Sequence, residues 1–402
     1  MPSTLPDGEP VPVDGSLPRR SLEGLGTRPF AFYVHVPFCV TRCGYCDFNT
    51  YTATELGPGA TRESYAATAV REVRMARRVL GDADLPVATV FVGGGTPTLL
   101  APGDLRRILE AIDGEFGLAP DAEVTTEANP ESVDERYLTE LREAGFTRVS
   151  YGMQSAREHV LAVLDRGHTP GRIPQVVEWT RKAGFEHVNL DLIYGTPGET
   201  DDDWKSSLEA ALAVEPDHVS AYALIVEEGT RLAAQVRRGE LTPPDDDAMA
   251  DRYLIADEVL NAHGLTWYEI SNWAAGPSAV CRHNMLYWTG TDWWGVGPGA
   301  HSHVGGTRWW NVKHPAAYAA RLAEGATPAH AREVLDDEDR RVERIMLELR
   351  LAQGCPTALM DDKDVRRAIE DGLIEPAPYE EGRAVLTTRG RLLADAVIRD
   401  LI

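Results

Sequence analysis

The stretch FYVHVPFCVTRCGYCDFNT, residues 32–50, identifies the fold of this 402-residue chain. An apolar, β-branched run leads directly into Cys39, Cys43 and Cys46, three of only five cysteines in the sequence. Thiolates on one tight loop can converge on a compact metal centre, and Gly44 would let such a loop bend sharply. The pattern therefore predicts a metal site immediately after a strand.

Several chemistries compete for this Cys-x-x-x-Cys-x-x-Cys spacing. A structural zinc site needs four ligands, usually as two separated pairs, whereas Cys281 and Cys355 are isolated and His35 lies inside the expected strand. A disulfide with a leftover thiol, or accidental clustering of buried thiols, would also place three cysteines close together. An iron–sulfur cubane is favoured, because three thiolates hold three irons and leave the fourth open to a non-protein ligand.

Outward from this stretch, short apolar runs alternate with amphipathic runs of helical period. We expect strands at residues 31–36, 87–93, 122–128, 148–154, 187–195 and 218–225. One expected helix spans about residues 61–80, and a second carries Leu105–Ile112. A third starts at a capping box of Ser132 and Glu135. A fourth carries Ile173–Val177, and a fifth starts at 200–203. This α/β order predicts parallel strands with right-handed crossovers, as a doubly wound sheet or a (β/α) barrel.

Both architectures bind ligands at the carboxyl ends of their strands. Polar and glycine-rich residues gather there: GGGTPT (93–98) follows the second strand, Glu127 and Gln154 end the third and fourth, and Asp191 lies in the fifth. An isolated Glu or Gln at a strand end is more often a solvated cap. The repeated pattern predicts one binding site along this edge.

We expect four parts along the chain. Residues 1–28, rich in Pro and Gly, form a flexible lead-in, and residues 29–265 form the α/β domain. Residues 266–334 form a connecting region rich in Trp, Gly and His. Residues 335–402 form a small, mainly helical C-terminal domain, for which a winged-helix arrangement is one option.

The composition excludes some classes of binding partner and indicates the cellular compartment. A net charge of −23 argues against nucleic acid or an anionic membrane as a partner. No apolar run approaches the roughly 18 residues of a membrane span, and the N-terminus lacks the apolar region of a signal peptide. Five irregularly spaced cysteines do not form a disulfide framework. We therefore expect a cytoplasmic protein in a reducing compartment.

The three-cysteine motif, with Tyr45 before its last cysteine, resembles the signature of the radical S-adenosylmethionine (SAM) superfamily. The resemblance implies a full or partial (β/α) barrel, so we expect a partial (β/α)6 barrel rather than a doubly wound sheet. It implies that Cys39, Cys43 and Cys46 hold a [4Fe–4S] cluster and that SAM chelates the fourth iron. One electron from the cluster then cleaves SAM to a 5′-deoxyadenosyl radical.

An ordered set of further motifs narrows the resemblance. YVHVPFC, GGGTPT, TEANP, YGMQS, DRGHT, DLIYGTPGET and GVGPGAHS, within residues 30–303, are similar to those of the oxygen-independent coproporphyrinogen III oxidase family. The resemblance implies that SAM is contacted by Tyr33, Tyr45, Gly94, Gly95, Thr96, Glu127, Gln154, Arg166 and Asp191. Backbone NH groups of the glycine segment would suit the methionine carboxylate. Arg166 would pair with a carboxylate, and Glu127 and Gln154 would bind polar atoms such as the ribose hydroxyls.

Two features separate the branches of this family. The oxidases carry a fourth cysteine where Phe48 stands here, together with an ordered N-terminal extension. The HemW-type haem chaperones carry His-Asn-x-x-Tyr-Trp, which matches His283, Asn284, Tyr287 and Trp288. The resemblance implies haem contact by these four residues, since imidazole is the commonest haem ligand. The alternative for His283 is a core histidine beside ordinary aromatic packing.

We therefore expect a haem chaperone with a [4Fe–4S] cluster, SAM and haem as its ligands and haem-acceptor proteins as its partners. The alternative is oxidative decarboxylation of coproporphyrinogen III, so whether the chain is an enzyme stays open. The sequence does not decide between a monomer and a homodimer.

Overall fold

The structure is a computed structural model that describes the chain except for residues 1–6, 54, 57–60, 168 and 170. Its strands are β1 (Phe30–Val36), β2 (Val87–Gly94), β3 (Leu118–Ala128), β4 (Arg148–Gln154), β5 (His187–Tyr194), β6 (His218–Ala223), β7 (Thr266–Glu269), β8 (Asn272–Ala274), β9 (Asp292–Val296), β10 (His301–Val304), β11 (Thr307–Asn311), β12 (Ala329–Val334), β13 (Cys355–Pro356) and β14 (Arg383–Ala384).

The helices alternate with these strands along the chain. They are α1 (Arg19–Leu22), α2 (Arg62–Leu80), α3 (Pro102–Phe116), α4 (Glu135–Glu143), α5 (Glu158–Val163), α6 (Arg172–Lys182), α7 (Asp201–Leu212), α8 (Arg231–Arg237), α9 (Asp246–Ala262), α10 (Arg282–Trp288), α11 (Pro315–Ala323), α12 (Asp337–Glu348), α13 (Asp362–Glu370), α14 (Pro376–Glu380), α15 (Thr388–Leu392) and α16 (Ala394–Leu401). Short 3-10 helices lie at η1 (Pro97–Leu99), η2 (Pro130–Ser132) and η3 (Thr357–Leu359).

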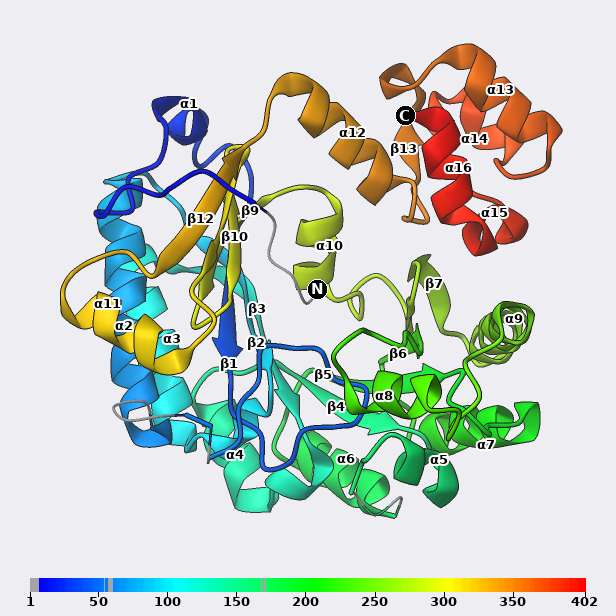
Figure 1. Ribbon diagram of the computed structural model, residues 1–402, viewed down its shortest axis with the longest axis horizontal. Coiled ribbons are helices and arrows are strands. Elements are labelled where there is room, and N and C mark those ends of the chain that lie inside the picture. Colours follow the sequence, from blue (N-terminus) through cyan, green and yellow to red (C-terminus); the bar gives the residue numbers. More distant parts are fainter. Residues whose placement is uncertain (1–6, 54, 57–60, 168, 170) are drawn as a thin grey trace.

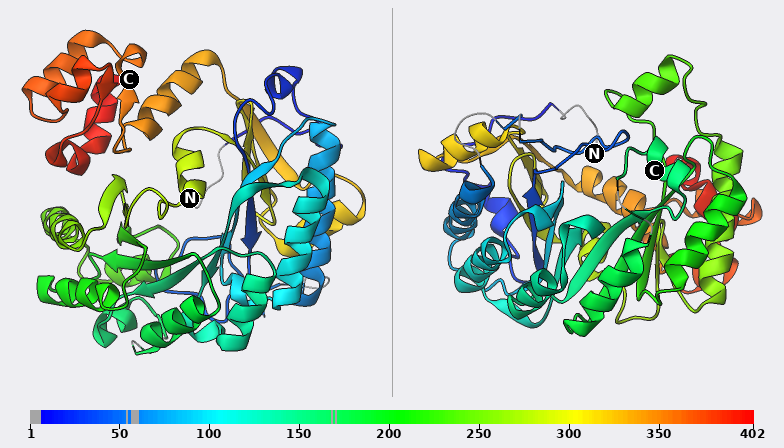
Figure 2. Two further views of the ribbon diagram at one scale, coloured as in Figure 1. Left: turned by 180° about the vertical axis from the view of Figure 1, so that it is seen from behind. Right: turned by 90° about the horizontal axis from the view of Figure 1, so that it is seen from below.

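The core of the molecule is a curved parallel sheet in which β1 to β6 lie side by side in chain order. Helices α2 to α7 cover its outer face, and α10 lies on the concave side (Figures 1 and 2). Each strand is joined to the next by a helical crossover, which is the partial (β/α)6 barrel that the sequence predicts. All six expected strands are present, with ends within a few residues of the prediction.

Side-chain alternation along β1 shows which residues face the interior. Phe32 packs against Phe116 of α3, with ring centroids 5.1 Å apart, so Phe32 faces the outer helices. Tyr33, one residue further on, faces the interior because successive side chains point to opposite faces of a strand. Its ring stacks on Phe91 of β2 at 6.3 Å. The same alternation turns Glu123 and Glu127 of β3 into the interior.

Antiparallel strands extend the parallel sheet at both edges. Strand β9 pairs in parallel with β1 and begins the series β9 to β12, whereas β8 and β7 continue the sheet beyond β6. Residues 266–334, which we expected to be a connecting region, therefore contribute six strands to the main sheet in the described part of the chain. Antiparallel strands need no crossover helix, so the βα rhythm stops there although the sheet continues.

The lead-in also contacts this sheet. Within the described residues 7–28, Glu9 forms an antiparallel bridge with Arg332 of β12. The Ser21 hydroxyl lies 2.6 Å from that of Thr307 in a buried contact. A segment that we expected to be flexible thus pairs with β12 and packs beside β11.

The C-terminal domain has its own apolar core, formed by Ile345, Leu349, Val365, Ile374, Val397 and Ile398 among others. It is mainly helical, as expected, with the small antiparallel pair β13–β14. Arg391 connects it to the barrel by an ion pair with Asp257 of α9 (2.9 Å) and by its guanidinium over the Trp267 ring (4.3 Å).

The start of α4 differs from the expected capping box. Asp134, not Ser132, is the N-cap, and its side chain accepts a hydrogen bond from the Tyr137 backbone NH. Ser132 belongs to the preceding short helix η2. Both residues are good N-caps, so composition alone did not distinguish them.

In the described residues, no helix combines the length and apolar character required to span a bilayer.

Candidate metal and cofactor site

The three cysteines of the first motif lie on one loop at the carboxyl end of β1. Cys39 is buried, Cys43 and Cys46 are half-buried, and all are free thiols. The pKa of Cys46 is raised to about 11, mainly by burial and in smaller part by the neighbouring Cys43 and Cys39 thiols. Metal ions would stabilise the thiolates that burial disfavours.

The number of thiols on this loop can be compared with the ligand sets of known metal centres. In the described part of the chain, no three His, Cys, Asp or Glu side chains lie close enough to surround one metal ion. A cubane takes one thiolate at each of three corners, so its sulfur ligands are spread around a cluster. Three cysteines on one loop match the donor set of a [4Fe–4S] cluster with one open iron, whereas a tetrahedral zinc site usually has four protein ligands.

Two glycines allow close packing around the cysteine loop. A Cβ atom on Gly44 would lie 2.5 Å from Asp165 Oδ2, and one on Gly95 would lie 2.5 Å from the Phe38 carbonyl oxygen and 3.0 Å from Cys39 Sγ. Gly44 does not adopt a positive φ. Its role is therefore close approach rather than the sharp bend that we expected.

The glycine segment after β2 holds the cysteine loop. The backbone NH of Gly95 donates to the Val36 carbonyl (2.8 Å), and that of Thr96 donates to the Phe38 carbonyl (2.7 Å). The NH of Gly94 donates to Glu127 Oε2 at 2.9 Å. Each of these NH groups already has a protein acceptor, which disfavours the expected binding of the methionine carboxylate; that Gly94, Gly95 and Thr96 contact SAM stays a prediction.

Glu127 and Asp191 are neighbouring carboxylates inside the barrel. Burial raises the pKa of Glu127 to about 8, and the charge of Asp191 adds to the rise. Burial raises the pKa of Asp191 to about 6, although hydrogen bonds from Ser220 and Ser150 lower it. The Ser150 hydroxyl lies 3.0 and 3.1 Å from the two Asp191 oxygens. A cationic ligand between these carboxylates would stabilise both as anions.

Gln154 and Arg166 carry buried polar atoms without protein partners. Gln154 Oε1 accepts no hydrogen bond, and Arg166 Nε donates none, within the described residues. Gln154 has a φ of 63°, a strained conformation for a non-glycine residue. Arg166 donates to the Gly152 carbonyl (2.8 Å) and contacts Cys43 Sγ (3.5 Å). Buried polar groups are nearly always paired, so these two atoms fit a polar ligand beside the cysteine loop.

The two tyrosines of the predicted site have different neighbours. The Tyr33 hydroxyl is 3.0 Å from His35 Nδ1 and faces Glu127. Tyr45 packs on the apolar cluster that contains Leu164 and Leu232, near the Arg166 guanidinium. The structure thus brings all nine predicted SAM-site residues around the cysteine loop. His168 of the DRGHT motif lies outside the described residues.

Sequence reasoning missed three polar residues of this interior. Ser150 and Ser220 bind Asp191, and Tyr222 of β6 faces Asp191, Glu269 and Glu127. Ser220 and Tyr222 alternate with outward residues of an expected strand, so the period of two was the available signal. Tyr222 is 42% exposed although it lies inside the sheet, which shows that the interior is open at this point.

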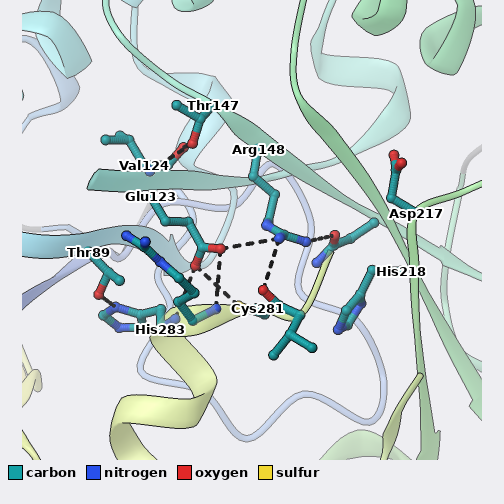
Figure 3. Close-up of polar contacts among 12 residues, drawn as sticks. Thr89, Glu123, Val124, Thr147, Arg148, Asp217, His218, Cys281 and His283 are labelled. Atoms are coloured by element: carbon teal, nitrogen blue, oxygen red, sulfur yellow. Dashed lines mark hydrogen bonds and ion pairs between the residues drawn. The ribbon is translucent and has the colours of Figure 1, made fainter. Parts of the chain in front are cut away.

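The second motif, HNMLYW, forms α10 near the amino-terminal ends of β2 to β4 (Figure 3). His283 is 1% exposed. Its Nδ1 lies 2.7 Å from Thr89 Oγ1 and its Nε2 lies 3.0 Å from the Tyr287 hydroxyl. Burial lowers the pKa of His283 to about 3, so the ring is neutral. This geometry favours the alternative of a core histidine, because neither ring nitrogen is free to bind iron.

A buried ion pair holds the start of α10 (Figure 3). The Glu123 carboxylate accepts from the backbone NH of His283 (3.0 Å) and of Arg282 (3.2 Å), and it lies 3.2 Å from Arg148. Arg148 also donates to Asn189 (2.7 Å) and to the Val280 carbonyl (3.2 Å). A carboxylate at a helix N-terminus satisfies its orphan NH groups, so β3 caps α10 across the interior.

The far end of α10 reaches toward the SAM residues. Tyr287 and Trp288 are half-buried, as is Asn284. Burial raises the pKa of Tyr287, and the nearby Cys281 and Glu127 charges add to the rise; the Trp288 indole hydrogen-bonds Glu269. The haem role of these three residues stays a prediction.

Comparison with known proteins decides the family. The radical SAM superfamily model matches residues 33–211. A Mycobacterium tuberculosis protein named haem chaperone HemW is 52% identical over 379 residues, which cover 93% of this chain and 95% of that relative. The chain belongs to the HemW family. A Bacillus subtilis HemW is 33% identical over 378 residues, which cover 91% of this chain and 97% of the relative.

A solved structure shares the fold of this HemW-family chain. The coproporphyrinogen III oxidase HemN from Escherichia coli, described as a radical SAM enzyme, superposes with a TM-score of 0.80 at 22% identity. The match covers 95% of this chain and 92% of the oxidase. At this identity the likeness concerns the fold alone.

Proposed function

We propose that this chain is a haem chaperone. It holds a [4Fe–4S] cluster through Cys39, Cys43 and Cys46, binds SAM beside the cluster, and delivers haem to acceptor proteins. The observation that carries the proposal is the placement of the HNMLYW helix: the His283 ring stacks on Phe91 (5.2 Å between ring centroids), which in turn stacks on Tyr33 of the SAM residues (6.3 Å). The HemW relatives, which are named haem chaperones, support the same function.

The side chains around the cysteine loop divide the work of binding SAM. When bound, the cluster and SAM supply one-electron chemistry at the sulfonium. Glu127 and Asp191 offer carboxylates to the cationic groups of SAM, which favours their charged forms against burial. Arg166, with its unpartnered Nε, offers a cation to the methionine carboxylate, a role that the occupied NH groups of the glycine segment do not perform.

The HNMLYW motif offers haem two aromatic side chains. Tyr287 and Trp288 are half-buried and line the interior, and aromatic rings pack well on a porphyrin face. His283 would reach haem iron only after giving up its bond to Thr89 or to Tyr287. We therefore propose that Tyr287, Trp288 and Asn284 contact haem and that His283 positions Tyr287.

Two measurements on anaerobically reconstituted protein test this function. Titration with haemin should shift the Soret band with saturable stoichiometry. Incubation with coproporphyrinogen III, SAM and a reductant should leave the substrate unchanged, because Phe48 stands where the oxidases carry a further cysteine. Formation of protoporphyrinogen would contradict the chaperone proposal and favour the oxidase alternative.

We further propose that the protein acts in the cytoplasm. All five cysteines are free thiols in the structure, which suits a reducing compartment. Whether the chain works as a monomer or a homodimer is decided by its mass in solution.

A further inference from the structure

The turn between β9 and β10 has no role in the proposed function, although its sequence GVGPGAHS is one of the motifs that carry the family resemblance. In the structure this turn lies against the carboxyl end of β1. A Cβ atom on Gly297 would lie 2.4 Å from the His35 carbonyl oxygen. A turn that approaches the β1 backbone so closely can hold the cysteine loop, which begins directly after β1.

One side chain joins the cysteine loop to this turn. Asn49, three residues after Cys46, donates from Nδ2 to the Pro298 carbonyl (2.9 Å) and to the Lys313 carbonyl (2.8 Å). The backbone carbonyl oxygen of Asn49 lies 2.9 Å from His35 Nε2. A Cβ atom on Gly299 would lie 2.6 Å from Asn49 Nδ2, so only glycine leaves space for the amide.

The segment of the loop that contains Asn49 and Tyr51 also binds the first cysteine, Cys39. The backbone NH of Cys39 donates to the Tyr51 carbonyl (3.0 Å), and the NH of Tyr51 donates to the Pro37 carbonyl (2.7 Å). The Tyr51 hydroxyl lies 3.1 Å from Asn49 Oδ1. The Tyr51 hydroxyl also donates to the Lys313 carbonyl (3.1 Å), so loss of the Asn49 side chain removes one of two supports of Tyr51, whose backbone holds Cys39.

Buried side chains from other elements hold the 295–300 turn in place. Glu72 of α2, which is 0% exposed, accepts from the Gly297 NH (2.8 Å) and from Asn311 Nδ2 (2.8 Å). Asn311 also donates to the Gly297 carbonyl (2.9 Å), and the Tyr318 hydroxyl contacts Glu72. The chain of contacts runs from the outer helix α2 through the turn to Asn49.

We propose that the 295–300 turn anchors the cysteine loop. Asn49 is the positioning residue, because its side chain joins the loop to this turn. The anchor keeps Cys39 in place for the cluster without touching iron or sulfide. This inference rests on the proposed cluster. It assigns to GVGPGAHS a role in cluster retention, which the sequence motif alone did not suggest.

The test uses matched pairs of variants in anaerobically reconstituted full-length protein. Asn49→Ala removes the two donated bonds and the bond accepted from the Tyr51 hydroxyl, and Gly299→Ala pushes the amide away. The control for the first is Asn261→Ala, whose exposed amide binds Asp257 within α9. The control for the second is Gly325→Ala, since Gly325 has a φ of 77° against 73° for Gly299 but, among the described residues, no atom near its Cβ position. Both glycine variants therefore carry similar backbone strain.

The readouts are the rate of iron loss to a chelator and the electron paramagnetic resonance spectrum of the reduced cluster with SAM. Asn49→Ala and Gly299→Ala should lose iron about tenfold faster than wild type, the effect expected when the side-chain hydrogen bonds of Asn49 are lost. The double variant should lose iron no faster than either single variant, because both substitutions disrupt the same contact between Asn49 and the turn. The two controls should stay within about twofold of wild type, as expected for sites outside the anchor.

Two outcomes overturn the inference and are distinguishable. If wild type assembles the cluster but both anchor variants release iron at the rate of their controls, the anchor is wrong and the proposed function stands. If wild type assembles no [4Fe–4S] cluster, the proposed function and the inference both fail. If Asn49→Ala does not fold, Gly299→Ala against Gly325→Ala decides the question alone.

Discussion

The Nε2 atom of His283 lies 3.0 Å from the hydroxyl oxygen of Tyr287, one helical turn further along α10. The other ring nitrogen is bound to Thr89, so the imidazole is fully used within the protein. A motif histidine that suggested iron ligation is thus a link between β2 and a tyrosine that faces the SAM residues.

This link makes a prediction for haem binding. His283→Gln keeps an amide that can reach the Tyr287 hydroxyl, whereas a glutamine is not a strong haem ligand. We expect His283→Gln to retain the wild-type Soret position in a haemin titration and to restore most of the affinity lost in His283→Ala. The affinity loss in His283→Ala should be about five- to tenfold, the effect of one buried hydrogen bond.

The matched variant for this test is Tyr287→Phe, which removes the hydroxyl and leaves the ring. It should weaken haemin binding as much as His283→Ala does, and the two changes together should not add. A Soret band that moves in both His283 variants and stays in Tyr287→Phe would instead make His283 the iron ligand.

Glu127 predicts a pH dependence of stability in the protein without ligands. Its pKa is raised from 4.5 to about 8, mainly by burial. Between these values the folded state keeps a proton that the unfolded state releases, so stability falls as pH rises through this window. The slope from this one group is at most about 1.4 kcal/mol per pH unit. Urea unfolding of wild type and Glu127→Gln at about pH 5 and at about pH 8 measures it.

In Glu127→Gln this contribution disappears, and the remaining slope comes from other groups such as Asp191, whose pKa is raised to about 6. The exposed Glu258→Gln serves as the control and should keep the wild-type profile. Equal profiles for wild type and Glu127→Gln would show that the Glu127 carboxyl is solvated rather than buried.

The ion pair between Glu123 and Arg148 predicts a large loss of stability when one partner is removed. The two side chains are 8% and 0% exposed, so Arg148→Met leaves a buried carboxylate unpaired. The expected loss is about 3–5 kcal/mol of unfolding free energy. The control is Arg136→Met, because Arg136 is 88% exposed in its pair with Glu140. That change should leave the unfolding free energy close to the wild-type value, because solvent screens an exposed ion pair; similar losses for both would mean that the Glu123 site is hydrated.

The parallel half of the fold could be predicted because its signals are local. Each strand from β1 to β6 is a continuous apolar run followed by an amphipathic helix, which indicates burial on both faces. The strands β7 to β12 lie in a region with no helix between most neighbours, so the rhythm that identified the barrel was absent there. Their partners β6 and β1 are distant in sequence.

The predicted SAM residues came together because the carboxyl ends of parallel strands meet at one edge. The sequence did not disclose which polar atoms are already used. The NH groups of Gly94, Gly95 and Thr96 and both nitrogens of His283 are committed to protein partners. Those partners lie on other strands or turns, and no periodicity reports them.

The proposed function requires that the polypeptide holds a cubane at three corners and leaves one iron open. The most direct measurement is iron, sulfide and zinc analysis of anaerobically reconstituted protein, with the resonance spectrum of the reduced cluster before and after SAM is added. We predict about four irons and four sulfides per chain, loss of both in Cys43→Ala, and a spectrum that changes with SAM. One zinc per chain without sulfide, or a spectrum that SAM leaves unchanged, would contradict this requirement.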